Sequence, residues 1–158
     1  MSILRGLILK IGLLISLSCV LTFTLSSPGY CDDWVYIFNS QDYTDYYNKR
    51  TININKDTHI IKVWIKRKYT DKGKIEFLNL IKQKGGSIDK YISIDHSLLL
   101  HYINYKEREF SINNSTWYST TGYPLLETKL PLNWKNINPD SVVDAIYLKI
   151  IKDYNLKR

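Results

Sequence analysis

The sequence predicts an α+β domain: an antiparallel β-sheet of about six strands, with a C-terminal helix packed on one face and a short helix after the central strand. Three observations support this prediction. Short segments with alternating polar and apolar residues recur along the chain, as in strands with one wet face. The chain holds 13 Tyr, a residue type that suits a half-buried pleated sheet. The C-terminal segment carries an apolar stripe at helical spacing.

The first half of the domain predicts strands and one helix. Four extended segments, rich in aromatic and β-branched residues or alternating in polarity, lie at 33–39, 43–47, 51–55 and 59–69. A break at 70–73 precedes apolar residues at helical spacing, which predict a short helix over 74–84. Gly85–Gly86 is a typical helix end.

The second half predicts further strands, at 97–104, 108–112, 115–121 and 125–130. An extended connector follows over 131–138. The last helix has the clearest signals, because Asn138 can cap it, Pro139 suits its first position and Asp140 favours the positive end of its dipole. Its buried stripe is predicted to comprise Val143, Ile146, Tyr147, Ile150, Ile151 and Tyr154, and its charged residues, Asp144 among them, lie mostly off that stripe.

The first residues have the layout of a secretory leader. Arg5 and Lys10 precede an uncharged run over 11–25, and small residues follow at 26–29. We therefore expect a signal peptide over 1–29 and one domain over 30–158. The domain is then exported, to the periplasm or to the cell surface.

Two other fates of the leader stay open. The uncharged run is shorter than the ~20 residues that span a bilayer, but it can be retained as an anchor. Cys19 is a candidate for lipidation, although the preceding Ser16-Leu17-Ser18 fits that signal poorly. Membrane contact is expected only through an uncleaved or lipidated N-terminus. Cleavage would leave Cys31 as the only cysteine.

The net charge of +7 is mildly basic, and the cations are scattered. The longest run, Lys66-Arg67-Lys68, continues a strand, so a solvated sheet face or edge explains it better than a nucleic-acid site. In the same strand Ile61, Val63 and Ile65 alternate with polar and aromatic residues. The candidate binding face of the sheet therefore comprises Lys62, Trp64, Lys66 and Lys68.

No catalytic or metal-binding pattern stands out. No two of His59, His96 and His101 are three or four residues apart, and the last two are expected on opposite faces of a strand. Metal sites need convergent ligands. Adjacent Asp95, His96 and Ser97 cannot take the geometry of a triad. We expect a protein that is not an enzyme and has no cofactor.

A series of short motifs runs in order from about Asp32 to the C-terminus. They are Asp33-Trp34-Val35, Tyr46-Tyr47-Asn48, Thr51-Ile52, Val63-Trp64-Ile65, Lys72-Gly73-Lys74, Ser97-Leu98-Leu99-Leu100, Lys106 to Phe110, Ser115 to Tyr118, and Trp134 with Ile137, Pro139 and Ser141. In this order and spacing the chain resembles the bacterial surface-adhesin protein E family.

The resemblance implies an exported α+β domain, and the member for which the family is named is similar to an adhesin that binds host matrix proteins as a dimer. Family members commonly carry two cysteines thought to tie the last helix to the sheet, and here those positions hold Tyr105 and about Ile151. The resemblance therefore implies a variant without the disulfide, with the helix held by packing alone. Loss of such a bond costs about 2–5 kcal/mol.

Three functions follow as expectations. The first is a non-enzymatic, protein-binding domain at the bacterial envelope or surface, with a homodimer allowed. The second is a structural or accessory subunit of a periplasmic or envelope complex. The third is a small carrier of haem or metal, which requires two of the three histidines to converge with a carboxylate in a pocket.

Overall fold

The computed structural model describes residues 33–157. The predictions about the leader, Cys19 and Cys31 lie outside these residues. The broad prediction of an α+β domain is confirmed, because an antiparallel sheet is combined with two α-helices. The sheet order is β1-β2-β4-β5-β6-β7.

The elements are the following. The strands are β1 (Trp34–Asn39), β2 (Tyr43–Asn48), β3 (Asn53–Asn55), β4 (Ile60–Tyr69), β5 (Ile94–Asn104), β6 (Glu109–Ser119), β7 (Pro124–Lys129) and β8 (Lys135–Asn136). The helices are α2 (Asp71–Gln83), the 3₁₀ turn η1 (Asp89–Tyr91) and α3 (Val142–Asp153).

The sheet has eight strands, whereas the sequence predicted about six. The two extra strands arise because β4 and β6 each pair, along one edge, with two shorter strands in succession. These are β2 and β3 on β4, and β7 and β8 on β6. The predicted segments at 108–112 and 115–121 form one strand, β6. Asn113 is the extra residue of a β-bulge there, because Leu100 pairs with Asn114 while His101 pairs with Ile112.

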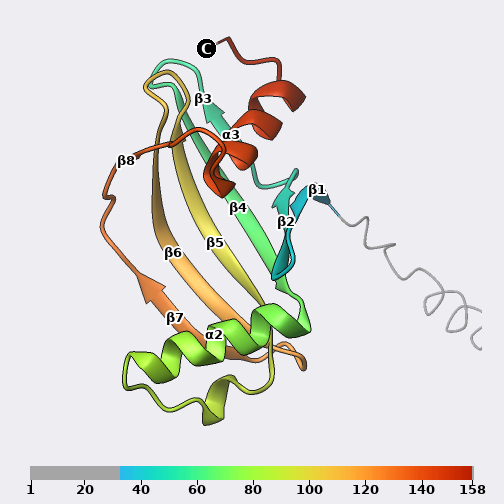
Figure 1. Cartoon of the computed structure of the whole chain (residues 1–158). Helices are drawn as coiled ribbons and strands as arrows, with labels where there is room; N and C mark the ends of the chain where they lie inside the picture. The colour runs from blue at the N-terminus through green and yellow to red at the C-terminus, as the bar shows by residue number, and fades with distance from the viewer. Residues whose placement is uncertain (1–32, 158) are drawn as a thin grey trace, which may run out of the picture. The chain divides into compact units, whose positions relative to one another are not determined.

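Both α-helices cover the same face of the sheet. Ile61, Val63 and Ile65 of β4 are fully buried, and they belong to one core with Ile146 and Ile150 of α3. At the other end of the sheet, Phe77 of α2 contacts Tyr69 and Trp117 through ring centroids 5.7 and 6.3 Å apart. Figure 1 shows α3 across one end and α2 across the other. We call this side the covered face.

Both helices begin at residues other than those predicted. The short helix starts at Asp71, because the Thr70 side chain accepts a hydrogen bond from the Gly73 amide and caps it. The last helix starts at Val142 with Ser141 as its cap, whereas Asn138 was predicted. The reason is local: Asp140 takes a φ of 60°, which a right-handed helix from Pro139 does not allow. Neither helix within 33–157 has the length and apolarity needed to cross a membrane.

Three turns at strand ends are Asx turns, in which an asparagine side chain accepts hydrogen bonds from the backbone. The side-chain oxygens of Asn48, Asn55 and Asn104 each accept hydrogen bonds from the backbone amides two and three residues later. Asparagine favours this turn because its short side chain mimics a backbone carbonyl. These turns fix where β2, β3 and β5 end.

Candidate functional site: the uncovered sheet face

The other side of the sheet, opposite the covered face, carries the predicted binding residues. Lys62, Trp64, Lys66 and Lys68 all belong to β4 and alternate with the buried isoleucine and valine residues of the core. Both described α-helices lie on the covered face. We call this second side, as presented by β1, β2, β4 and β5, the uncovered face.

The strand register surrounds the four residues with aromatic and apolar side chains. Lys62 pairs with Tyr102, Trp64 with Leu100, and Lys66 with Tyr46 on one side and Leu98 on the other. Directly paired residues of antiparallel strands point to the same face, so these side chains form one continuous surface. Tyr36 of β1 extends it and is 52% exposed.

Lysine ammonium groups on this face lie over aromatic rings. The Lys66 Nζ atom is 4.6 Å from the Trp34 ring centroid and 5.8 Å from that of Tyr46. The Lys62 Nζ atom is 5.6 Å from the Tyr102 centroid. Cation–π contacts at exposed sites are worth about 0.5–1 kcal/mol, so they order these long side chains without neutralising their charge.

On strands β1 to β4 the charge of the uncovered face is of one sign, and on β5 the Asp95 carboxylate lies 2.9 Å from the Nδ1 atom of His96. Within strands β1 to β4 the only acidic residue is Asp45. It pairs with Arg67, and both side chains lie on the covered face. Lys62 and Lys68 are solvent-exposed on the other side. The central strip of the uncovered face is therefore basic and aromatic, which favours an acidic partner.

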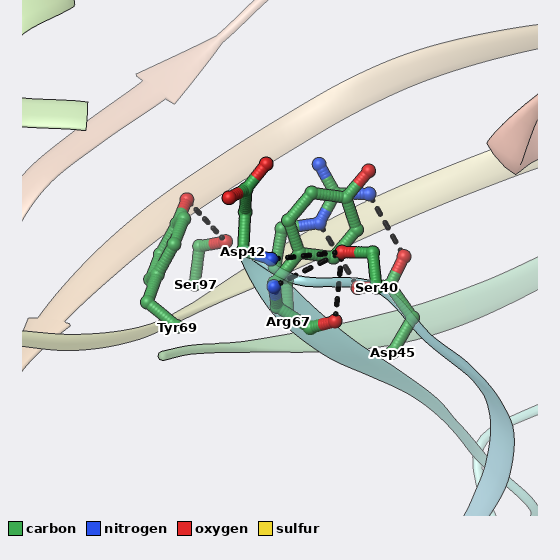
Figure 2. A network of polar contacts seen from close by, with 7 residues as sticks. Ser40, Asp42, Asp45, Arg67, Tyr69 and Ser97 are labelled. Carbon is green, nitrogen blue, oxygen red and sulfur yellow. Dashed lines mark hydrogen bonds and ion pairs between the residues drawn. The ribbon is translucent and has the colours of Figure 1, made fainter. Parts of the chain in front are cut away.

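The position of Arg67 differs from the one predicted from the sequence. The run Lys66-Arg67-Lys68 was predicted to lie on a solvated face or edge, yet β4 is an interior strand and Arg67 points to the covered face. Its Nε and Nη2 atoms donate to the two carboxylate oxygens of Asp45 at 2.9 and 2.8 Å, as Figure 2 shows. The guanidinium group also lies 3.7 Å from the Tyr43 ring centroid.

The Asp45–Arg67 pair is a buried structural feature of the covered face. Asp45 is fully buried, and 23% of the Arg67 side chain is exposed. Burial alone would lower the pKa of Arg67, but the hydrogen bonds and charge of Asp45 raise it. Nearby, the Tyr69 and Ser97 hydroxyl groups are 3.4 Å apart. The alternation of β4 could have revealed this placement, since Arg67 has the same parity as Ile61, Val63 and Ile65.

The three histidines do not form a common site. His96 lies on the uncovered face, where its ring stacks on Tyr118 and its Nδ1 atom is 2.9 Å from Asp95. His101 lies buried on the covered face, opposite Ile112, as the five-residue spacing predicted. His59 packs against Tyr105 at a strand end. No three His, Cys, Asp or Glu side chains within residues 33–157 are placed to hold a metal ion.

His101 is an unusual member of the core. Neither ring nitrogen has a hydrogen-bond partner within the described part of the chain. Desolvation by burial, with a smaller contribution from the charge of Arg67, lowers its pKa to about 3. The imidazole is therefore neutral at physiological pH.

The last helix is held by polar contacts in addition to packing. The Tyr47 hydroxyl donates to Asp153 at 2.8 Å, and Arg108 donates to Asp144 at 2.8 Å. Asp144 is buried, which corrects the prediction that it lies off the buried side of the helix. Tyr105 and Ile151, the positions where the resemblance implied a lost disulfide, are both members of the core.

Comparisons of the chain with protein-family models, with curated proteins and with solved structures found no match in any of the three.

Proposed function

We propose that this chain is an exported, non-enzymatic domain of the surface-adhesin E type that binds an acidic protein at the bacterial envelope or surface. One observation carries the proposal: the uncovered face combines Lys62, Lys66 and Lys68 with Trp64 and neighbouring aromatic rings, without an acidic residue in β1 to β4 on that face. Aromatic residues are enriched in protein interfaces, and a patch of lysines steers the approach of a negatively charged partner.

The leader supports export, and the ordered motifs support the family. The α+β architecture is the one that the resemblance implied. The positions of the histidines weigh against a haem or metal carrier, because His96 and His101 lie on opposite faces of the sheet. A structural role in an envelope complex is the alternative, and it differs in the identity of the partner rather than in the surface used.

Site-specific photo-crosslinking tests the proposed surface. A photoreactive phenylalanine at Tyr36 or Trp64 of the full-length chain, expressed in its bacterial host, should capture a partner. The same group at Ile75, an exposed residue of α2, is the control, since it lies away from the uncovered face. The captured partner should be acidic and should be released at high salt, because salt screens exposed charges.

Charge reversal provides a matched comparison. Lys62→Glu with Lys68→Glu should weaken binding at least tenfold and reduce its dependence on salt. Lys82→Glu with Lys84→Glu, two exposed lysines at the end of α2, changes the net charge equally and should have little effect. Equal losses in both double variants, or crosslinks only from Ile75, would contradict the proposal.

Partner identity separates the two protein-binding functions. Capture of extracellular matrix proteins supports adhesion, and capture of envelope proteins alone supports an accessory subunit. A crosslink between two copies of this chain indicates a homodimer through the face. Mass spectrometry of the exported protein then gives the cleavage site, any lipid on Cys19 and the redox state of Cys31.

A further inference from the structure

A cavity of about 410 Å³ lies on the covered face, beside strand β6. It opens beside the segment that connects β7 to β8, two strands that both pair with β6. The segment between these strands is held at both ends, because the Leu130 amide donates to the Asn113 carbonyl and the Asn133 amide donates to the Ser111 hydroxyl oxygen. The cavity volume lies in the range of about 300–1,000 Å³ typical of small-molecule sites.

The walls of the cavity are apolar. The apolar part of the lining comprises Phe110, Ile112 and Trp117 of β6 with Leu130 and Pro131 of the segment between β7 and β8. Leu130 is 56% exposed although it lines the cavity. A bound apolar group would therefore remove hydrophobic surface from water, which stabilises the complex by about 25 cal/mol per Å².

The cavity lining has one charged residue, Lys135, and its other polar members are Ser111, Ser115, Thr128 and Asn133. Ser115 and Thr128 form a direct cross-strand pair, and both line the cavity. Lys135 pairs with Phe110, so the two side chains point to the same face. Lys135 forms no ion pair with any residue in the range 33–157, and no acidic residue lines the cavity.

We propose that this cavity binds a small monocarboxylate with an unbranched apolar body, of the kind represented by a medium-chain fatty acid. The apolar walls hold the chain, and the Lys135 ammonium group meets the carboxylate. Charge-assisted hydrogen bonds are about twice as strong as neutral ones, which gives the carboxylate preference over an alcohol of equal length. The inference does not depend on the proposed function, because the cavity and the uncovered face lie on opposite sides of the sheet.

Two other hollows in the described structure lack this one-sided charge. One, of about 490 Å³, is lined by Asp89 together with Lys84 and Lys90. The other, of about 320 Å³, is lined by Asp153 together with Lys49. Each of these two hollows has a carboxylate in its lining, which would repel a bound anion, and the cavity beside β6 has none.

Calorimetric titration of the full-length chain with decanoate tests the inference, and decanol is the uncharged comparison. Decanoate should bind saturably with one site, and decanol should bind at least tenfold more weakly. Lys135→Met should weaken decanoate binding by roughly tenfold and leave decanol unaffected. Lys129→Met is the matched control: it removes the same charge from neighbouring β7, on the opposite face, and should leave the affinity unchanged.

Filling the cavity locates the site. Ser115→Trp should abolish decanoate binding, with folding checked by circular dichroism. A folded Ser115→Trp variant that binds as well as the original chain would overturn the inference. If that variant does not fold, the decanol and Lys135→Met comparisons still decide. The absence of saturable binding, equal binding of decanol, or equal losses in Lys129→Met and Lys135→Met would each overturn it.

Discussion

The hydroxyl group of Tyr147 in α3 donates a hydrogen bond to the carbonyl oxygen of Tyr105, 3.1 Å away and just beyond the end of β5. Tyr147 is fully buried and Tyr105 nearly so. The bond therefore links the last helix to the sheet at one of the two positions where the family resemblance implied a lost disulfide. With Tyr47–Asp153 and Arg108–Asp144, it shows that directional contacts supplement packing in holding α3.

Removing this hydroxyl group should destabilise the domain modestly. Tyr147→Phe keeps the ring in the core and loses one buried hydrogen bond, so we expect the free energy of unfolding to fall by about 1 kcal/mol. Chemical denaturation followed by circular dichroism measures it. Tyr123→Phe, at a residue that is 73% exposed, is the control and should change stability very little. Equal values for Tyr147→Phe and the original chain would show that the bond contributes nothing.

Breaking the Asp45–Arg67 pair should have a larger effect. Arg67→Met leaves the fully buried Asp45 carboxylate without its bidentate partner, and we expect a loss of about 3 kcal/mol or more. Replacing both residues, with Asp45→Leu and Arg67→Met, removes the unpaired charge and should recover most of that loss. A double-mutant cycle on unfolding free energies gives the coupling. Additive losses would contradict the pairing.

The buried His101 should make stability depend on pH. Its pKa is lowered in the folded state to about 3, against about 6.5 in the unfolded chain. The unfolded chain therefore binds a proton below pH 6.5 that the folded chain does not, and stability falls as pH decreases from 6.5 towards 3. This residue alone should lower the free energy of unfolding by about 2 kcal/mol between pH 7.5 and pH 5.

Comparison of two histidine variants isolates this contribution. His101→Phe should flatten the dependence of unfolding free energy on pH over this range. His96→Gln, on the uncovered face, should leave the contribution of His101 intact. A pH profile that is unchanged in His101→Phe would contradict the burial of a neutral imidazole.

Gly73 should be intolerant of any side chain. A Cβ atom at this position would collide with the backbone carbonyl of Asp42, in the turn between β1 and β2. The Thr70 amide donates to the same carbonyl at 2.9 Å, so the turn cannot simply move away from α2. We expect Gly73→Ala to lower the melting temperature by an amount equivalent to about 1–3 kcal/mol.

Gly86→Ala is the matched control for this prediction. Its added Cβ atom would come closest to the Ile81 side chain, which can change rotamer, and would lie farther from the Ile81 backbone carbonyl. A smaller loss is expected there. If alanine at Gly73 were as well tolerated as at Gly86, the close approach of α2 to the β1–β2 turn would be wrong.

The sequence was most informative where one local pattern decides an element. The alternation in 59–69 correctly predicted β4 and its two faces, because a strand has a side-chain period of two. Gly85 takes a φ of 75° after α2, so the predicted helix end is also confirmed. The start of α3 was predicted wrongly, because Asn138 was taken as its cap, whereas the left-handed backbone of Asp140 delays the helix until after Ser141.

Local sequence patterns predicted the pairing and register of the strands less well. In the sequence, Asn113 and Asn114 separate two predicted strands. In the structure β6 continues through both residues with a bulge, because it pairs with β5 on one side and with β7 on the other. Likewise, the pairing of Asp45 with Arg67 spans 22 residues and depends on register between β2 and β4. Such register is set by long-range packing of the buried side chains.

The sequence by itself determined the α+β class, the alternation of β4 and the placement of Lys62, Trp64, Lys66 and Lys68 on one face, because these depend on the local period of the chain. Only the tertiary structure decided that both α-helices lie on the opposite face, that Arg67 turns inward to Asp45, and that a cavity opens between β6 and the segment ending at Lys135. Those features arise from contacts between residues distant in sequence, whose free energy exists only once the sheet has assembled.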